Sequence, residues 1–465
     1  MTTNSNILLF EGKPLKAVYF LGIGGIGMSA LARYYNSRGV RVSGYDKTPT
    51  ALTTSLQQEG INVHFTDDVN LADKEAAFVV YTPAIPAHHT ELNYFKQHQY
   101  PMRKRSEVLG SITRPHFNIC VAGTHGKTTT SSMIAHLLTD SGYGCNAFLG
   151  GIAANYNSNY WSHERNVYVA EADEYDRSFL QLEPDIAIIT SMDADHLDIY
   201  GTEKNMQDAF VAFASKIKPG GLLIAKRGLP RQNDFLVSNK MQYDATHSDV
   251  AIYAQNIRIQ NGGYCFDAVV GNRIIKNVIL NMGGMHNVEN AMACIAVALQ
   301  MEISEAQIIK AIANFKGVKR RFEYILKPQD DAGTVMIDDY AHHPQELKAL
   351  IEGAQNMYPH KQLTVVFQPH LYSRTRDHAQ GFADVLSMAH QTILLPIYPA
   401  RELPMPGVSS QMILDKMSNA HHQILSKEEL LQWVNDNPTQ LLIISGAGDI
   451  DTLVQPIKEL ITQKK

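Results

Sequence analysis

The chain has 465 residues, of which 45% are hydrophobic and 19% are charged, and its formal net charge is -5. A chain of this length and composition is expected to fold into about three globular domains. The negative charge argues against a nucleic-acid partner, and because no apolar run is long enough to span a bilayer, no membrane insertion is expected.

The cysteines indicate the compartment. Four cysteines are scattered along the chain, and none of them forms a C-x-x-C pair. This pattern favours reduced thiols over a disulfide framework or a zinc site. The N-terminal segment also lacks the basic start of a signal peptide. We therefore expect a cytoplasmic protein.

Residues 1–106 are predicted to form a Rossmann-like first domain, because a strand, a glycine turn and a helix follow one another near its start. The strand covers 17–21, the helix covers 28–35, and the turn between them fits G-x-G-x-x-G with Gly22, Ile23, Gly24, Gly25, Ile26 and Gly27. Asp46 follows the next strand, 40–45, about where dinucleotide-binding folds place the acid that binds ribose. On this stretch alone NAD binding would be the first interpretation, but the turn recognises a pyrophosphate and not a nicotinamide, so any nucleotide diphosphate could use it.

A further buried strand is predicted at 76–82. Its end should lie beside the glycine turn, because ligands bind at the carboxyl edge of parallel strands. Thr82, Pro83 and Ala84 are therefore candidates for the same ligand. The alternative is that the glycines serve only close packing of the turn.

Residues 107–322 are predicted to form a P-loop ATPase-like central domain. A buried strand at 119–122 leads into a glycine loop, and apolar residues at helical spacing follow at 131–138. Loop amides and a helix N-terminus bind phosphate, Lys127 adds a positive charge, and Thr128 can offer a hydroxyl to Mg²⁺. The loop consists of Gly123, Thr124, His125, Gly126, Lys127, Thr128 and Thr129. Position 121 is Val where the strict motif has Gly, so an ordinary strand-to-helix turn is the alternative.

Two acidic segments follow predicted strands of this domain. The strand at 166–170 ends in a run from Glu171 to Asp176, and the strand at 185–191 ends in a run that contains His196. Strand tips next to a phosphate loop are where ligands for a metal ion belong. The alternative for either segment is a solvated turn.

The end of the central domain offers further candidates for nucleotide binding. Residues 248–282 are predicted to form a small antiparallel addition, and a helix follows it. Asn287 and Asn290 share one face near the start of that helix, where they could cap it or contact a base. Arg320, at the domain boundary, could contribute charge to an ATP site from across a cleft.

Residues 323–465 are predicted to form a second Rossmann-like domain, with strands at 334–338, 363–367, 392–397 and 441–445. Three of these strands end in polar residues, which should meet at one edge of the sheet. They include Asp339, Tyr340, His342, His370 and Arg374. Arg374 can bind a carboxylate through two hydrogen bonds, and the alternative is a surface ion pair with Asp377.

Taken in order, these segments resemble the Mur ligases, the ATP-dependent amide ligases of peptidoglycan synthesis. The segments that carry the resemblance include G-I-G-G-I-G-M-S, A-G-T-H-G-K-T-T-T, E-A-D-E, D-H-L-D, R-R-F, D-D-Y-A-H-H-P and F-Q-P-H-L-Y-S-R-T-R-D. The resemblance covers nearly the whole chain and is closest to the alanine-adding branch. It implies a UDP-sugar-binding domain at 1–106, an ATP-binding domain at 107–322 and an amino-acid-binding domain at 323–465.

The resemblance also implies ligands and roles. ATP and Mg²⁺ would be the cofactors, and UDP-N-acetylmuramate and L-alanine the substrates, with the enzyme a monomer or a weak homodimer. Lys127, Glu171 and His196 would be the catalytic residues, and Thr128, Glu171 and His196 would hold the metal. Asn287 and Asn290 would hold the adenine, and Arg320 and Asp339 would contact ATP. The alanine pocket would consist of Tyr340, His342, His370 and Arg374.

Two sequence features distinguish this chain within the family. Residue 371 is Leu where we expect many relatives to carry Arg. Other Mur ligases use a carbamylated lysine for a second Mg²⁺, and the segment 205–215, where it is expected, has no lysine. The second feature agrees with the alanine-adding branch.

Three other functions are compatible with parts of the pattern. A muropeptide-recycling ligase would share the three-domain plan but add a tripeptide. An NAD-dependent oxidoreductase fused to a kinase would use the first glycine turn for a nicotinamide cofactor. A non-enzymatic nucleotide switch would keep the phosphate loop and need no Arg/His cluster in the third domain.

Overall fold

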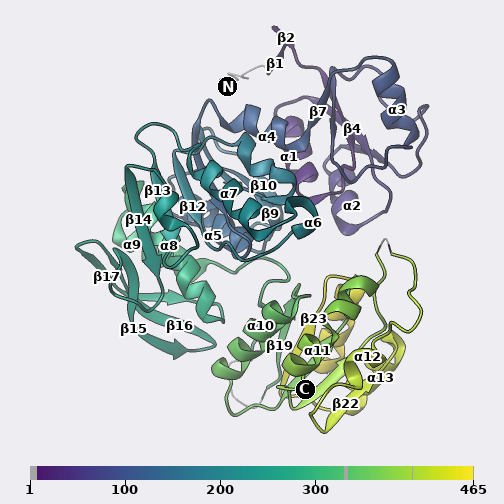
Figure 1. The fold of residues 1–465 in the computed structure, drawn as a ribbon, viewed down its shortest axis with the longest axis vertical. Coiled ribbons are helices and arrows are strands. Elements are labelled where there is room, and N and C mark those ends of the chain that lie inside the picture. The colour runs from purple at the N-terminus through teal and green to yellow at the C-terminus, as the bar shows by residue number, and fades with distance from the viewer. Residues whose placement is uncertain (1–7, 329–332, 401, 464–465) are drawn as a thin grey trace. The chain divides into compact units, whose positions relative to one another are not determined.

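The computed structural model describes residues 8–328, 333–400 and 402–463 and has an α/β fold built on three large sheets (Figure 1). This confirms the predicted class. The described residues belong to two compact units, each with its own core. The first unit runs to Gln255 and adds Asp267–Lys276 and Glu289–Phe315, and the second takes Asn256–Phe266, Asn277–Val288 and the chain from Lys316 onward. Among these residues, no helix has the length and apolarity needed to cross a bilayer.

The first sheet is parallel and has the strand order β5-β4-β3-β6-β7. All residues of its central strand β3 are buried, as expected for a strand covered on both faces. The strands are β3 (Ala17–Leu21), β4 (Arg41–Tyr45), β5 (Asn62–His64), β6 (Phe78–Tyr81) and β7 (Met102–Lys104), after a short hairpin of β1 (Leu9–Phe10) and β2 (Lys13–Pro14). The helices are α1 (Ile26–Ser37), α2 (Ala51–Gln58), α3 (Thr90–Gln97) and α4 (Arg105–Thr113).

The second sheet has ten strands in the order β10-β9-β11-β8-β12-β13-β14-β15-β16-β17. The strands from β9 to β15 in this order pair in parallel, whereas β10 pairs antiparallel with β9. The strands are β8 (Phe117–Ala122), β9 (Asn146–Ala153), β10 (Ser158–Trp161), β11 (Val167–Glu171), β12 (Ile186–Ile189), β13 (Leu222–Lys226), β14 (Asn239–Asp244), β15 (Ile252–Gln260), β16 (Gly263–Val270) and β17 (Arg273–Leu280).

Helices connect many of the strands of this second sheet. Helix α5 packs against β8, β9 and β11, which places its N-terminus at the carboxyl edge of the sheet. The α-helices are α5 (Lys127–Asp140), α6 (Leu197–Tyr200), α7 (Glu203–Ala214), α8 (Met285–Gln300) and α9 (Glu305–Asn314), and short 3-10 helices cover Tyr175–Gln181 and Gln232–Asp234.

The third sheet has the order β18-β19-β23-β20-β21-β22 and is parallel except for β18. Its strands are β18 (Glu323–Leu326), β19 (Val335–Asp339), β20 (Leu363–Phe367), β21 (Gln391–Leu394), β22 (His421–Ile424) and β23 (Leu441–Ser445). Its helices are α10 (Pro344–Met357), α11 (Tyr372–Leu386), α12 (Gln411–Leu414), α13 (Lys427–Asp436) and α14 (Val454–Gln463), with a 3-10 turn at Asp449–Leu453. Asp339 and Phe367 both pair with Ser445, so the three polar tips expected from the sequence do lie at one edge.

A buried polar cluster joins α1 to the second sheet. Helix α1 packs against β9 and β10. Arg33, whose side chain is 7% exposed, pairs with Glu59 at 2.6 Å and donates a hydrogen bond of 2.5 Å to Asn159 of β10. Asn159 in turn donates to the Ile26 carbonyl at 2.6 Å and to the Ser29 hydroxyl at 3.0 Å. These contacts hold the first two sheets in one unit.

We expect Arg33→Ala to lower the free energy of unfolding by about 2 kcal/mol, because the Asn159 oxygen loses its donor inside the protein. The midpoint of thermal unfolding measures this change. Arg41→Ala is the matched control, since Arg41 is 54% exposed and its pairs with Asp73 and Glu75 lie at the surface. Its effect should stay below about 0.5 kcal/mol. Equal shifts for the two variants would mean that the buried cluster adds nothing beyond a surface ion pair.

Candidate functional site

The phosphate-binding loop lies between β8 and α5, as the sequence predicted. The chain turns at Gly123 with a φ of 138°, and Gly126, with a φ of 81°, precedes the first residue of α5. A Cβ at Gly123 would lie 2.0 Å from the Thr190 hydroxyl, so only glycine fits there. Thr190 donates a hydrogen bond of 2.5 Å to the His125 carbonyl, and Ser191 accepts one of 2.7 Å from the His125 amide. The tip of β12 therefore shapes the loop.

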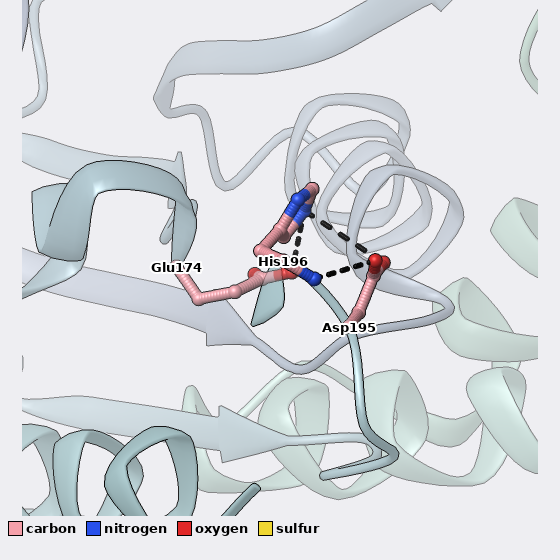
Figure 2. A group of neighbouring side chains, drawn as sticks. All are labelled: Glu174, Asp195 and His196. Carbon is pink, nitrogen blue, oxygen red and sulfur yellow. Dashed lines mark hydrogen bonds and ion pairs between the residues drawn. The ribbon is translucent and has the colours of Figure 1, made fainter. Parts of the chain in front are cut away.

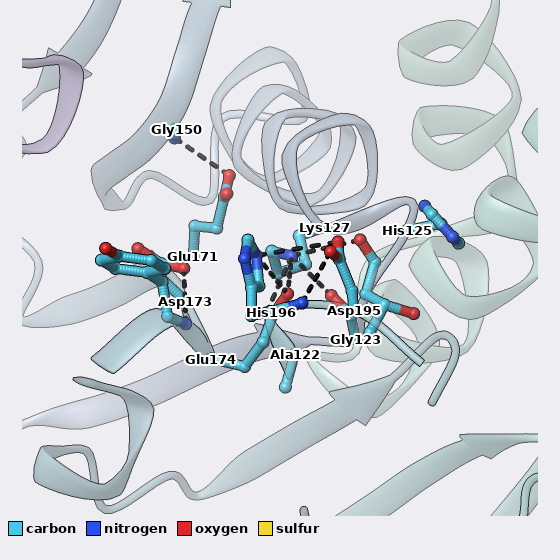
Figure 3. A network of polar contacts seen from close by, with 12 residues as sticks. Ala122, Gly123, His125, Lys127, Gly150, Glu171, Asp173, Glu174, Asp195 and His196 are labelled. Atoms are coloured by element: carbon cyan, nitrogen blue, oxygen red, sulfur yellow. Dashed lines mark hydrogen bonds and ion pairs between the residues drawn. The ribbon is translucent and has the colours of Figure 1, made fainter. Parts of the chain in front are cut away.

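Lys127 is held at the centre of this loop (Figure 3). Its Nζ donates to the Gly123 carbonyl at 2.6 Å and contacts the two carboxylate oxygens of Glu174 at 2.9 and 2.8 Å. Burial disfavours the ammonium, but the negative charges of Glu174, Glu171 and Asp173 outweigh it and raise the pKa of Lys127. Lys127 is therefore a cation that a buried carboxylate neutralises.

Glu171 ends β11 beside the loop. It accepts a hydrogen bond of 3.0 Å from the Gly150 amide. Burial raises the pKa of Glu171, although the charge of Lys127 and the neighbouring Thr128 hydroxyl oppose this. Thr128 and Glu171, both predicted metal ligands, are thus neighbours, and Figure 3 shows the Glu171 carboxylate directed to Gly150.

His196 follows β12, and its side chain lies next to Glu174 of the acidic segment that follows β11 (Figure 2). Its Nε2 lies 3.8 Å from Oε1 of Glu174 and 3.7 Å from Oδ2 of Asp195. Its backbone has a φ of 50°, a conformation that is unusual for a residue other than glycine and that occurs often at functional sites. Glu174, Asp195 and His196 offer ligand atoms that all lie within 4.8 Å of one another.

Glu174 is the residue that the sequence analysis missed. It belongs to the acidic run that begins at Glu171. Because it follows the end of the strand by three residues, the sequence gave no reason to select it as a site residue. The structure buries Glu174 completely between Lys127 and His196. By contrast His125, a predicted ATP ligand, has a 41% exposed side chain near Asp193, and Figure 3 shows it pointing away from Lys127.

The asparagines of α8 are buried at its start. A Cβ at Gly126 would lie 3.0 Å from Oδ1 of Asn290, so this side chain borders the phosphate loop. Asn287 donates a hydrogen bond of 2.7 Å to the Gly283 carbonyl, which is a contact at the helix start. Contact of either residue with a base stays a prediction.

The glycine turn of the first sheet has the expected neighbours. The Asp46 carboxylate accepts a hydrogen bond of 2.7 Å from the Gly24 amide, so here it stabilises the turn itself. A Cβ at Gly22 would lie 2.9 Å from the Thr82 methyl group, which places the end of β6 beside the turn as predicted. Helix α1 begins at Ile26, so Ile26 and Gly27 lie in its first turn. Pro83 and Ala84 are exposed next to Thr82.

Arg320 and the acidic end of β19 form a connected group in the second unit. Arg320 lies 3.7 Å from Asp338 and 3.4 Å from Asp451, and it donates a hydrogen bond of 2.5 Å to the Gly446 carbonyl. Asp339 accepts hydrogen bonds from the Phe322 and Ala341 amides at 2.6 and 2.7 Å. Burial raises the pKa of Asp338 to about 7 and that of Asp339 to about 6. These contacts are structural, and contact with ATP stays a prediction.

The residues that were predicted to bind the substrate amino acid lie close together at the same edge of the third sheet. The rings of Tyr340 and His342 are 5.3 Å apart, and those of His342 and His370 are 6.0 Å apart. Arg374 lies 3.5 Å from Nδ1 of His370. Burial lowers the pKa of His342.

Arg374 has no carboxylate partner in the described part of the chain. Asp377, the alternative partner, pairs with Arg376 at 2.7 Å. Leu371 precedes α11 with a φ of 71°, so the start of this helix is strained where the pocket is expected. Two further residues border the cluster and were not selected from the sequence. The Tyr398 ring stacks on His370 at 5.9 Å, and the Arg321 guanidinium lies 5.4 Å from the Tyr340 ring.

Comparisons with known proteins agree with this geometry. Three family models match: the Mur ligase family, catalytic domain over residues 17–117, the Mur ligase middle domain over 121–298, and the Mur ligase, glutamate ligase domain over 320–448. The UDP-N-acetylmuramate--L-alanine ligase of Flavobacterium johnsoniae is 47% identical over 453 residues, which cover 97% of this chain and 98% of that protein. The ligase of the same name from Porphyromonas gingivalis is 48% identical over 456 residues, with 96% and 99% covered.

A solved structure extends the comparison to the fold. The UDP-N-acetylmuramate-alanine ligase of Thermotoga maritima has a TM-score of 0.84 to this chain at 25% identity, with 97% of this chain and 100% of that chain covered. A phosphate loop beside two acidic strand tips, within three α/β domains, is an arrangement for phosphoryl transfer from a nucleotide. The chain belongs to the Mur ligase family.

Proposed function

We propose that the protein is an ADP-forming ligase that joins L-alanine to the lactyl carboxylate of UDP-N-acetylmuramate in peptidoglycan precursor synthesis. Relatives named UDP-N-acetylmuramate--L-alanine ligase match nearly the whole chain at 44–48% identity. The observation on which the chemistry rests is that Lys127, Glu174 and His196 meet at one phosphate-binding loop. A cytoplasmic location and a monomeric or weakly dimeric state remain predictions.

The chemistry requires activation of a carboxylate. A carboxylate does not react with an amine at neutral pH, because its oxygen is a poor leaving group. Transfer of the γ-phosphoryl group of ATP to that oxygen gives an acyl phosphate and ADP. The amine of L-alanine then attacks the acyl carbon, phosphate leaves, and the nitrogen loses a proton. Lys127 would stabilise the charge that develops on the transferring group.

The residues beside the loop fit a divalent ion. Mg²⁺ prefers oxygen ligands, and the carboxylates of Glu171, Glu174 and Asp195 with the Thr128 hydroxyl supply them, while His196 adds a nitrogen. When bound, Mg²⁺ would supply positive charge at the transferring phosphoryl group. We propose Thr128 and Glu171 for one ion, and Glu171 with His196 for a second.

We expect Glu171→Gln and His196→Ala each to raise the Mg²⁺ concentration needed for half-maximal turnover several-fold, because each removes one proposed ligand. Titration of Mg²⁺ at saturating ATP measures this. Asp234→Asn is a suitable control, since Asp234 pairs with Arg231 in a short helix outside the loop. Unchanged Mg²⁺ dependence of both variants would mean that the two strand tips are structural.

The other ligands are assigned by region. For the nucleotide we propose the loop from Gly123 to Thr129, with Asn287 and Asn290 at the adenine and Arg320 and Asp339 at ATP. The UDP-sugar would bind at the glycine turn from Gly22 to Gly27 with Asp46, Thr82, Pro83 and Ala84. Tyr340, His342, His370 and Arg374 would form the L-alanine pocket.

The proposal is tested by ADP release measured with UDP-N-acetylmuramate and each amino acid in turn. L-Alanine should give the highest rate. A preference for a tripeptide over L-alanine would favour a muropeptide-recycling ligase. NADH binding at the first glycine turn would favour an oxidoreductase, and ADP release that is independent of the acceptor would favour a nucleotide switch.

A further inference from the structure

Glu174 contacts both Lys127 and His196, and the chemistry proposed above uses it only as an oxygen ligand for a divalent ion. Both oxygens of its carboxylate contact Nζ of Lys127, Oε2 at 2.8 Å and Oε1 at 2.9 Å, and Oε1 also lies 3.8 Å from Nε2 of His196. The side chain of Glu174 is 0% exposed and that of Lys127 is 14% exposed. A carboxylate and an ammonium buried together attract each other strongly, because water does not screen them.

The lysine has no hydrogen-bonding capacity left for a phosphate. An ammonium carries three protons. Those of Lys127 are directed at Glu174, at the Gly123 carbonyl at 2.6 Å and, more weakly, at the Thr124 carbonyl at 3.4 Å. A phosphate oxygen that binds Lys127 must therefore displace one of these acceptors. Glu174 is the one acceptor that is not part of the loop and that carries a negative charge, so an incoming phosphate repels it and replaces its charge.

Two hydrogen bonds anchor the main chain of Glu174. Its carbonyl accepts hydrogen bonds from the Tyr200 hydroxyl at 2.6 Å and from the Arg177 amide at 2.9 Å. Tyr200 is buried at the end of α6, the helix that follows His196. The tip of β11 is thereby tied to the tip of β12, and Figure 2 shows the Glu174 carboxylate next to His196.

We propose that Glu174 is a positioning residue that competes with the nucleotide phosphates for Lys127. In the nucleotide-free protein it holds the ammonium against the loop, and nucleotide binding has to break this contact. The inference rests on the proposed function for the identity of the nucleotide. Because a site that is competent for only part of the time binds with reduced apparent affinity, the contact lowers the affinity for the nucleotide.

The test measures ADP binding by calorimetry in the presence of EDTA, so that metal ligation does not contribute. Glu174→Gln keeps the shape of the side chain and removes its charge. We expect this variant to bind ADP roughly fivefold more tightly than the parent, if Lys127 is free for about a fifth of the time in the parent. ADP should also raise the thermal midpoint of the variant more than that of the parent, which a merely structural role of Glu174 would not produce.

Asp173→Asn is the matched control. It removes one carboxylate charge from the neighbouring residue, which pairs with Arg105 at 3.2 Å and not with the lysine. Its ADP affinity should stay within about twofold of the parent, because only through-space attraction changes. If Glu174→Gln fails to fold, Glu174→Asp keeps the charge on a shorter arm and should bind ADP more tightly than the parent, by a smaller factor.

The experiment distinguishes failure of the inference about Glu174 from failure of the proposed function. Unchanged or weaker ADP binding by the folded Glu174 variant would overturn the inference, as would an equal gain in Asp173→Asn. No binding of ADP or ATP to the parent protein, with or without Mg²⁺, would instead overturn the proposed function and the inference with it.

Discussion

Lys127→Ala is expected to lower the rate of ligation by about 10²-fold or more. Lys127 is the one side chain that brings a positive charge into the loop between β8 and α5, among the loop residues that the structure describes. Its ammonium is held in the loop, where it lies 2.6 Å from the Gly123 carbonyl. Without it, the charge that develops during phosphoryl transfer is stabilised only by backbone amides and bound metal.

Two measurements make this prediction specific. ADP release at saturating substrates gives the rate, and calorimetry gives the affinity for UDP-N-acetylmuramate, which should hardly change because its proposed site is the first sheet. Lys204→Ala is the control, since Lys204 is 77% exposed in a surface pair with Asp208. Near-normal turnover of Lys127→Ala would contradict the assignment of residues 123–129 as the phosphate-binding loop. Loss of UDP-N-acetylmuramate binding would mean that the variant is misfolded.

The parts of the fold that the sequence predicted are those with strong local patterns. The strand at 17–21 has the predicted bounds, and the one at 119–122 is found as β8, because short apolar runs that lead into a glycine turn have few alternatives in an α/β chain. Strand β9 was not predicted. It contains two consecutive glycines, Gly150 and Gly151, and its pairing with β11 and β10 rather than its composition makes it a strand.

Contacts between distant segments were the harder part of the site to predict. Glu171 was predicted from its position at a strand end, whereas Glu174 reaches Lys127 because the chain turns sharply after it. Asp176 and Arg177 have φ values of 52° and 55°, a conformation that is uncommon outside glycine and that the sequence does not signal at an arginine. Arg33 and Asn159, which are 126 positions apart, pair only because α1 packs on the second sheet.

Arg374→Lys is expected to raise the KM for L-alanine by roughly 10- to 100-fold, with little change in the constants for ATP and UDP-N-acetylmuramate. L-Alanine offers few contacts, so its carboxylate has to contribute much of the binding energy. A guanidinium binds a carboxylate through two parallel hydrogen bonds, and an ammonium cannot reproduce that geometry. The substitution keeps the charge, so it tests geometry rather than field strength.

The structure strengthens the case for Arg374. Its guanidinium lies 3.5 Å from His370, and Asp377, which could have neutralised it, pairs with Arg376. Leu371 has no group that could donate a hydrogen bond to a carboxylate, so we expect Arg374 to matter more here than in relatives with an arginine at that position. Arg376→Lys is the matched control, since Arg376 lies on the same helix with a 53% exposed side chain. If the Arg374 variant changed the constants of all three substrates equally, Arg374 would support the domain or the phosphate, and the alanine pocket would lie elsewhere.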